Sequence, residues 1–325
     1  MSWSRMRALG RWISAGLGVL SLLMAALFLL SIFLTVNGYT EAYLGSPPET
    51  IAVRVRALPL YLGPLPVYLP IGWFAPVGLS ELMTALLAIY TLCLFKTFVD
   101  GGCSLLGVLR LRCMVDGNSF SALTSYTSAT LVAVVVIQQL QERVGVKTGS
   151  LAYKNELLKY ISVALAPLIE EVGFRALLIG LAILAIVVGA LGPGTIGAAG
   201  AVRLIVYPWT GREAVVERYG RDALRVPAAA LIAASSLIFG TVHYLYGAGW
   251  QVGKVTTATL AGLTLGYVYY RYGLPASIMS HYVFNHFLLT YHYVGGALEA
   301  FADLTLFVQG LVALAYLMAR AARMA

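Results

Sequence analysis

The sequence predicts an all-α membrane protein, a polytopic bundle of about eight transmembrane helices. Two observations point to this fold class. Hydrophobic residues make up 60% of the 325 residues and charged residues only 11%, which is less than half the charge of an average soluble domain. In addition, apolar runs of the roughly 20 residues that cross a bilayer as a helix recur along the chain. We therefore expect an integral, multi-pass membrane protein whose surroundings are membrane lipid.

The net charge of the chain is +8. A basic protein could bind nucleic acid, but the lysines and arginines are spread over short hydrophilic connections and are not gathered in a patch. An excess of positive charge in the loops on one side is typical of membrane orientation. This excess predicts that the N- and C-termini are cytoplasmic, and no nucleic-acid partner is expected.

Residues 1–150 predict an N-terminal membrane region with about three spans, at 12–36, 77–99 and 122–140. The connection at 37–76 holds seven of the twelve prolines, so we expect an extended segment that rests on the membrane surface. Two interpretations of this connection stay open. It could be a lid or substrate-facing loop, or it could be an ordered interfacial connection.

Three cysteines, Cys93, Cys103 and Cys113, lie near the end of the second span and in the loop that follows it. An odd number of cysteines without paired spacing does not indicate a disulfide framework or a zinc motif. We expect ordinary buried or free thiols.

Residues 151–295 predict a core region, and residues 296–325 a C-terminal span. The first span of the core, at 157–191, contains Pro167, which should either start a new helix or kink a long one. The hydrophilic segment at 192–225 predicts a cytoplasmic loop with a surface helix. The remaining spans are expected at 226–244, 255–270, 274–293 and 301–320.

Three charged residues, Glu170, Glu171 and Arg175, lie in the middle of the first core span. Charged groups are costly inside a bilayer and need compensation there. On a helix Glu171 and Arg175 are four residues apart and share a face, so we expect them to form an ion pair. Glu170 points about 100° away from Glu171. The pattern therefore predicts one carboxylate that is paired structurally and one that is left for chemistry.

Two later spans each supply a histidine in apolar surroundings. Phe239 and His243 are four residues apart, as are His281 and Asn285, so each pair shares a helical face. A carboxylate near two imidazoles and an amide could form a hydrolytic site. Glu170 would then act as general base for water, and the histidines and the amide would donate hydrogen bonds to an oxyanion.

The same residues allow two other interpretations. Glu170, His243 and His281 are a possible zinc set, because two histidines and one glutamate hold catalytic zinc in known enzymes, although no His-Glu-x-x-His motif is present. A buried histidine can also simply satisfy a hydrogen bond in a helix bundle. For His286 and His292 this is the expected role, since no second polar partner is spaced to meet them.

Three motifs follow each other on successive spans: Glu-Glu-x-x-x-Arg ending at Arg175, Phe-x-x-x-His ending at His243, and His-x-x-x-Asn ending at Asn285. In this order they resemble the CPBP family of intramembrane proteases, which includes the type II CAAX prenyl endopeptidases. The resemblance covers residues 157–293. It implies a membrane-embedded protease, and it says nothing about the first three spans or the last one.

The resemblance also implies a role for each motif residue. Glu170 would activate the attacking water and His243 would assist it, while His281 and Asn285 would stabilise the oxyanion. The family is commonly described as metal-dependent, so a divalent metal such as zinc is a possible cofactor, but a carboxylate mechanism without metal fits the residues as well. Two residues would support the site, Glu171 and Arg175.

Two classes of function are therefore considered. The first is an intramembrane endopeptidase that hydrolyses a peptide bond of a membrane-associated protein or peptide, which could be prenylated near its C-terminus. The second is a non-proteolytic membrane protein, such as a scaffold, an immunity protein or a transporter, that uses the same buried polar cluster for binding or proton coupling. The three complete motifs favour the enzyme. A transporter would more often show paired repeats with broken helices, and the sequence shows none.

Overall fold

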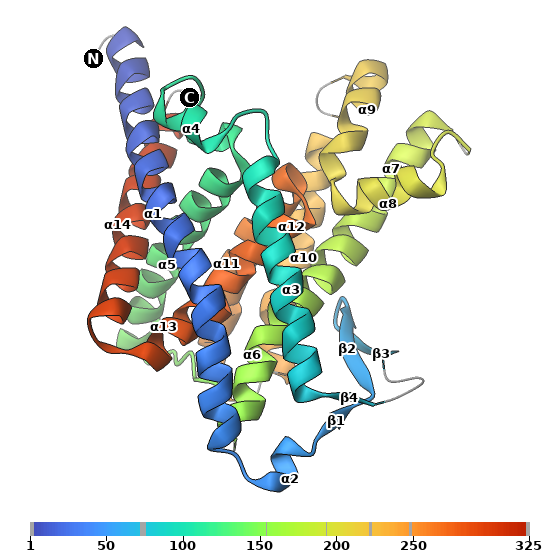
Figure 1. Ribbon diagram of the computed structural model, residues 1–325. Helices are drawn as coiled ribbons and strands as arrows, with labels where there is room; N and C mark the ends of the chain where they lie inside the picture. The colour runs from blue at the N-terminus through green and yellow to red at the C-terminus, as the bar shows by residue number, and fades with distance from the viewer. Residues whose placement is uncertain are drawn as a thin grey trace.

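Long apolar helices dominate the fold, as Figure 1 shows. The computed structural model describes residues 3–71, 76–153, 155–192, 194–220, 223–246 and 249–322. Within these residues, six helical segments are long and apolar enough to cross a membrane. They comprise α1 (Trp3–Leu44), α3 (Leu79–Val99), α5 (Ser119–Arg143), the continuous segment from α6 (Glu156–Glu171) to α7 (Leu181–Leu191), α10 (Arg225–Tyr246) and α14 (Gly296–Ala321).

Two further helical segments lie where the remaining spans were predicted. One is α11 (Gly253–Tyr272). The other is a broken helix made of α12 (Leu274–Tyr282), the π-helical turn η4 (Val283–Phe287) and α13 (Leu288–Val294). The predicted fold class, an all-α polytopic membrane protein, is confirmed.

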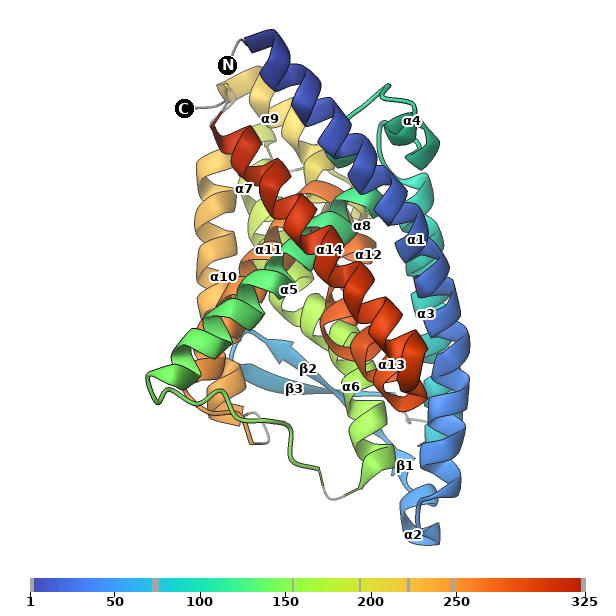
Figure 2. The ribbon, with the colours of Figure 1, turned by 90° about the vertical axis from the view of Figure 1, so that its left-hand side faces the viewer.

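Short elements connect these helices. Their bounds are α2 (Pro48–Ile51), β1 (Arg54–Val55), β2 (Ala57–Leu62), β3 (Leu65–Pro70), β4 (Val77–Gly78), α4 (Leu105–Leu109), η1 (Val115–Gly117), α8 (Ala198–Val206), η3 (Pro208–Gly211) and α9 (Arg212–Tyr219). The described ends of the chain lie at the same end of the bundle as α4 and α9, whereas α2, β1 and the start of α6 lie at the other end (Figures 1 and 2).

The helix α12 is buried in the centre of the bundle. All its residues from Ala276 to Tyr282 are buried. The Tyr282 hydroxyl hydrogen-bonds Ser31 of α1 at 3.0 Å, and its ring packs against Tyr90 of α3. Because neighbouring helices shield α12 from lipid, it can carry serine and histidine side chains at membrane depth.

Pro167 lies inside α6 and does not start a new helix, so one of the two predicted alternatives is wrong. The helix continues beyond it, and the wider π-helical turns of η2 (Val172–Gly180) follow directly after Glu171. Insertions of this kind frequently mark functional sites in helices. Here the change from α-helical to π-helical turns begins directly after the carboxylates Glu170 and Glu171.

The extended segment that the prolines predicted at 37–76 is present only in part, in the strands β2 and β3. The helix α1 continues to Leu44, and residues 57–70 form an antiparallel hairpin of β2 and β3. Residues 72–75 of the predicted connection lie outside the described residues. The hairpin forms because Gly63, at φ +63°, and the following proline supply a two-residue turn between two runs of apolar residues.

The alternation of hydrogen-bonded and non-hydrogen-bonded residue pairs explains which positions of the hairpin hold prolines. The Ile71 amide donates to the Arg56 carbonyl at 3.0 Å, and hydrogen-bonded pairs alternate with non-hydrogen-bonded pairs along the register. Three prolines, Pro59, Pro66 and Pro70, therefore occupy positions whose backbone points outward from the hairpin. A proline has no N–H group, so the outer edges carry fewer unpaired donors at the membrane.

The loop before α5 contains a disulfide bond between Cys103 and Cys113, so the prediction of free or buried thiols is wrong for these two residues. The loop returns on itself through a bridge between Gly101 and Asn118, which brings the two Cα atoms within 6.5 Å. This closure depends on loop geometry and is not visible in the cysteine spacing. Cys93 is a free thiol.

Candidate active site

A cavity of about 350 Å³ opens at the end of the bundle that carries the hairpin and the start of α6. Its walls come from β2, α6, α10, the beginning of α11 and η4. The residues that line it include three of the predicted site residues, Glu170, His243 and Asn285. Volumes of this order are typical of small-molecule and peptide side-chain sites.

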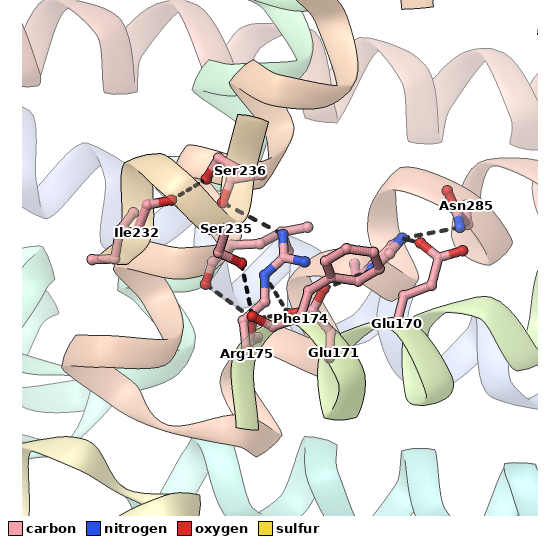
Figure 3. Close-up of polar contacts among 12 residues, drawn as sticks. Glu170, Glu171, Phe174, Arg175, Ile232, Ser235, Ser236 and Asn285 are labelled. Carbon is pink, nitrogen blue, oxygen red and sulfur yellow. Dashed lines mark hydrogen bonds and ion pairs between the residues drawn. The ribbon is translucent and has the colours of Figure 1, made fainter. Parts of the chain in front are cut away.

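The two adjacent carboxylates of α6 diverge, as predicted from helix geometry. Figure 3 shows Glu170 on the side of Asn285, whereas Glu171 lies toward Arg175. The predicted ion pair is present, with Arg175 Nε 3.3 Å from Glu171 Oε2, and both side chains are 0% exposed. Glu171 is therefore held structurally, and Glu170 faces the cavity.

The Arg175 guanidinium is further enclosed by aromatic rings and backbone. Its centre lies 4.5 Å from the Phe239 ring centroid, a distance at which a cation is attracted to the ring face. Arg175 Nη2 donates to the Gly262 carbonyl at 3.4 Å. Beside it, the Ser235 hydroxyl donates to the Phe174 carbonyl at 2.7 Å (Figure 3). Arg175 thus ties η2 to α10 and α11 beneath the cavity.

Glu171 also connects α6 to α12. Its Oε1 atom lies 2.8 Å from His281 Nδ1, and its Oε2 atom accepts a hydrogen bond from the Ser277 hydroxyl. A carboxylate at Nδ1 requires that this nitrogen carries the proton, which leaves Nε2 directed at the remaining groups of the site. Glu171 therefore orients the His281 ring.

His243 is oriented in a similar way by its own helix. Its Nδ1 atom lies 2.9 Å from the Phe239 carbonyl and must donate to it. The Nε2 atom is then free and lies 3.9 Å from Glu170 Oε2. Both histidines consequently turn Nε2 toward the same carboxylate.

The groups converge on Glu170 Oε2. His281 Nε2 lies 3.6 Å from this oxygen, and Asn285 Nδ2 lies 3.2 Å from His281 Nε2. Among the described residues, Glu170 Oε2 has no hydrogen-bond partner although it is buried from solvent. Burying a carboxylate oxygen without a hydrogen-bond partner costs free energy. Glu170 Oε2 can therefore accept a hydrogen bond from a small polar molecule such as water.

A catalytic zinc site is the alternative role for Glu170, His243 and His281. The part of the chain that the structure describes contains no group of three His, Cys, Asp or Glu residues arranged to hold a metal ion. The Asn285 amide nitrogen faces the His281 Nε2 lone pair that a metal would need. The zinc set of Glu170, His243 and His281 would require that this amide moves away from His281 Nε2.

Sequence reasoning missed three residues around the site. Ser277 lies four residues before His281, and this i, i+4 spacing could have revealed it. Tyr61 of β2 lines the cavity, and its ring stacks on Phe174 at 6.1 Å between centroids. Lys254 lines the cavity from the first turn of α11. Tyr61 and Lys254 lie on elements that carry none of the three motifs. Their positions in the sequence therefore have no regular spacing from the motif residues.

Tyr61 is a hydrogen-bond donor at the cavity. Burial raises the pKa of the Tyr61 phenol, and the charge of the Glu170 carboxylate raises it further. The hydroxyl therefore stays protonated at neutral pH.

The two remaining histidines lie outside the cavity. His286 is buried, and its Nε2 atom lies 3.1 Å from the Thr35 hydroxyl of α1. His292 is exposed, so it does not have the buried position that was expected, and its Nδ1 atom lies 2.9 Å from Glu299 Oε1. Glu299 follows in α14, after the turn that ends α13, and that turn brings it back to His292.

Comparison with known families agrees with the resemblance drawn from the motifs. Residues 156–287 match the model of the family described as type II CAAX prenyl endopeptidase Rce1-like. The matched segment contains every residue of the three motifs. No curated protein and no solved structure matches the chain.

Proposed function

With residues 156–287 belonging to the Rce1-like family of type II CAAX prenyl endopeptidases, we propose that the protein is an intramembrane endopeptidase that uses Glu170 to activate water. The family match supports the assignment of a CAAX-type endopeptidase that acts on a membrane-associated protein. One observation carries the proposed mechanism. Glu170 Oε2 is buried without a hydrogen-bond partner among the described residues, and two imidazole nitrogens lie within 3.9 Å of it.

In the proposed mechanism, a water molecule donates one hydrogen bond to Glu170 Oε2 and the other to His243 Nε2. Glu170 takes a proton as the water oxygen attacks the scissile carbonyl carbon. The tetrahedral intermediate then collapses, the peptide C–N bond breaks, and the proton passes from Glu170 to the leaving amine. The products are a new carboxyl terminus and a released C-terminal fragment.

The oxyanion would be stabilised by His281 and Asn285. Their nitrogens lie 3.2 Å apart, so both can donate to one oxygen when His281 carries protons on both ring nitrogens. Glu171 holds the His281 ring in the orientation that this requires, because it accepts from His281 Nδ1. Donors held in place before the reaction stabilise developing charge without reorganisation.

Glu170→Gln tests the role of the general base. The amide keeps the shape of the side chain but cannot take a proton, so turnover should fall by about 10²–10⁴-fold while peptide binding is retained. The assay uses purified protein in lipid vesicles with prenylated and unprenylated peptides, and it measures the released fragment. Wild-type turnover by the Gln variant would contradict the proposed base.

Removal of bound metal by a chelator tests whether the mechanism requires a metal ion. We expect activity to survive dialysis against a strong chelator, since no protein group in the proposed mechanism depends on a metal. Stoichiometric zinc in active protein, lost together with activity and restored by added zinc, would replace this mechanism by a metal-dependent one.

The same vesicle assay separates the two classes of function. A scaffold, an immunity protein or a transporter would release no fragment from any peptide. Cleavage of the prenylated peptide alone would assign the prenyl group a role in recognition. Cleavage of both peptides would extend the substrates to membrane-associated peptides in general.

A further inference from the structure

Another cavity, of about 460 Å³, lies between α10, α11 and α14, and each of these helices contributes an arginine to it. Arg225 is the first residue of α10, Arg271 is the last but one of α11, and Arg320 is the last but one of α14. Among the described residues, no carboxylate lines this cavity. The ends of membrane helices lie near the level of the lipid head groups, so the three guanidinium groups are at the depth of lipid phosphates.

The charge of Arg271 has no ion-pair partner in the part of the chain that the structure describes. Its side chain is exposed. Arg320 differs, because its Nη1 atom pairs with Asp116. A guanidinium group has five N–H donors, so Arg320 can donate to a second anion while it stays paired. The cavity therefore offers one uncompensated positive charge and further donors beside it.

The deeper wall of the cavity is apolar. Ala228, Ala229 and Ile232 follow Arg225 by three, four and seven residues, so they lie below it on one face of α10. At a rise of 1.5 Å per residue, Ile232 is about 10 Å further into the membrane than Arg225. Below the arginines α10 and α11 pack closely, since a Cβ atom on Gly266 would lie 2.9 Å from Ile232 Cγ2.

Lipid surrounds the helices on both sides of this cavity. Val226 of α10 and Met318 of α14, which are neighbours of the cavity arginines in the sequence, are each 66% exposed. Apolar side chains exposed on membrane helices contact lipid. A soluble anion could contact the arginines but would leave the apolar wall uncovered, whereas a lipid has an anionic end and an apolar end in the same order as the cavity.

We propose that this cavity binds one anionic phospholipid, with its phosphate at Arg271 and Arg320 and one acyl chain on Ala229 and Ile232. Guanidinium groups bind phosphate oxygens by paired charge-assisted hydrogen bonds, and basic pockets between membrane helices bind lipid phosphates. The bound lipid would link the start of α10 to the ends of α11 and α14. None of the proposed catalytic residues lines this cavity, so the inference does not depend on the proposed endopeptidase function.

The test measures lipid binding directly. Native mass spectrometry of delipidated protein in detergent counts bound lipids during titration with phosphatidylglycerol, and with phosphatidylcholine of the same acyl chains as the comparison. Wild-type protein should bind one phosphatidylglycerol in preference to phosphatidylcholine. Arg271→Gln should weaken phosphatidylglycerol binding about five- to tenfold, because an arginine near the membrane surface contributes on this order, and Arg271→Lys should keep part of the affinity.

Arg112→Gln is the matched control for the charge. Arg112 is exposed in the disulfide loop and does not line the cavity, so this variant should bind phosphatidylglycerol like the wild type. Equal weakening in Arg112→Gln and Arg271→Gln would show a general attraction of anionic lipid to basic loops and would overturn the site.

A second pair of variants tests the acyl chain. Ala229→Phe places a ring on the apolar wall and should weaken phosphatidylglycerol binding. Its neighbour Ala230 is also exposed but does not line the cavity, so Ala230→Phe should bind as the wild type does. Glycerol 3-phosphate carries the phosphate without acyl chains and should not displace the lipid at equal concentration.

Each other outcome overturns the inference. Equal affinity of the wild type for the two lipids, or unchanged affinity in Arg271→Gln, would remove the phosphate site. Wild-type affinity in Ala229→Phe would place the acyl chain elsewhere, and this result decides the matter even if Arg271→Gln fails to fold. Displacement by glycerol 3-phosphate would assign the arginines to a soluble phosphate. Loss of binding in Glu170→Gln would place the lipid in the cavity of the candidate active site.

Discussion

Arg175 is the largest fully buried side chain among the described residues, and its charge is compensated inside the bundle by Glu171. Removing one partner of a buried ion pair leaves the other charge uncompensated and costs about 3–5 kcal/mol. We expect Arg175→Ala and Glu171→Gln each to lower the free energy of unfolding by about this amount, measured by denaturant or thermal unfolding in detergent. Glu171→Gln should also lower activity, since Glu171 orients His281.

A partly exposed ion pair provides the control for this prediction. Arg320 of α14 pairs with Asp116, and its side chain is 40% exposed. Exposed pairs contribute about 0–1 kcal/mol, so Arg320→Ala should destabilise the protein far less than Arg175→Ala. Equal unfolding midpoints for the two variants would show that the buried pair is not required for stability.

At the scale of secondary-structure elements, the hairpin of β2 and β3 depends on Gly173. A Cβ atom on Gly173 would collide with the Tyr61 carbonyl, so only glycine lets the hairpin lie against η2. Gly173→Ala should push the hairpin and Tyr61 away from Glu170. A misplacement of about 1 Å near a reacting group can cost roughly a hundredfold in rate, and we expect a loss of this order in the peptide assay.

Gly189→Ala is the matched control for the hairpin. Gly189 lies in α7, and a Cβ atom there would meet nothing within 4 Å. Alanine also favours a helix over glycine, so this variant should keep both activity and stability. Wild-type activity in Gly173→Ala would mean that the hairpin plays no part in arranging the site.

For the whole molecule, the start of α6, which contributes to the cavity, and α4, which lies in the disulfide loop, are at opposite ends of the bundle (Figure 1). We expect an impermeant maleimide to label Lys147→Cys and Arg110→Cys from opposite sides of the membrane. The background for both variants replaces Cys93 by Ala and the disulfide cysteines, Cys103 and Cys113, by Ser. Labelling of both positions from one side would contradict the spanning arrangement.

The same measurement determines which way the cavity faces. The loop charges predict cytoplasmic termini, which would place the cavity on the other side of the membrane. A disulfide near the termini is typical of an oxidising compartment, because cytosolic thiols are usually kept reduced. Labelling of Arg110→Cys in intact cells would place the disulfide loop outside and the cavity in the cytoplasm.

The sequence by itself determined the fold class and the buried ion pair, because both depend on local properties. Apolar runs predict membrane helices wherever they occur, and the four-residue spacing of Glu171 and Arg175 brings them together within one helix. The same spacing placed His281 and Asn285 on one face. The three motifs also predicted the family match.

Only the tertiary structure decided which elements meet. The sequence does not encode in any local spacing that the hairpin bearing Tyr61 lies over Glu170, that Lys254 lines the same cavity as His243, or that Cys103 reaches Cys113. Such contacts depend on how helices cross and on which glycines permit close approach, as Gly173 does for the hairpin. These relations join segments far apart in the chain, and packing of the whole bundle fixes them.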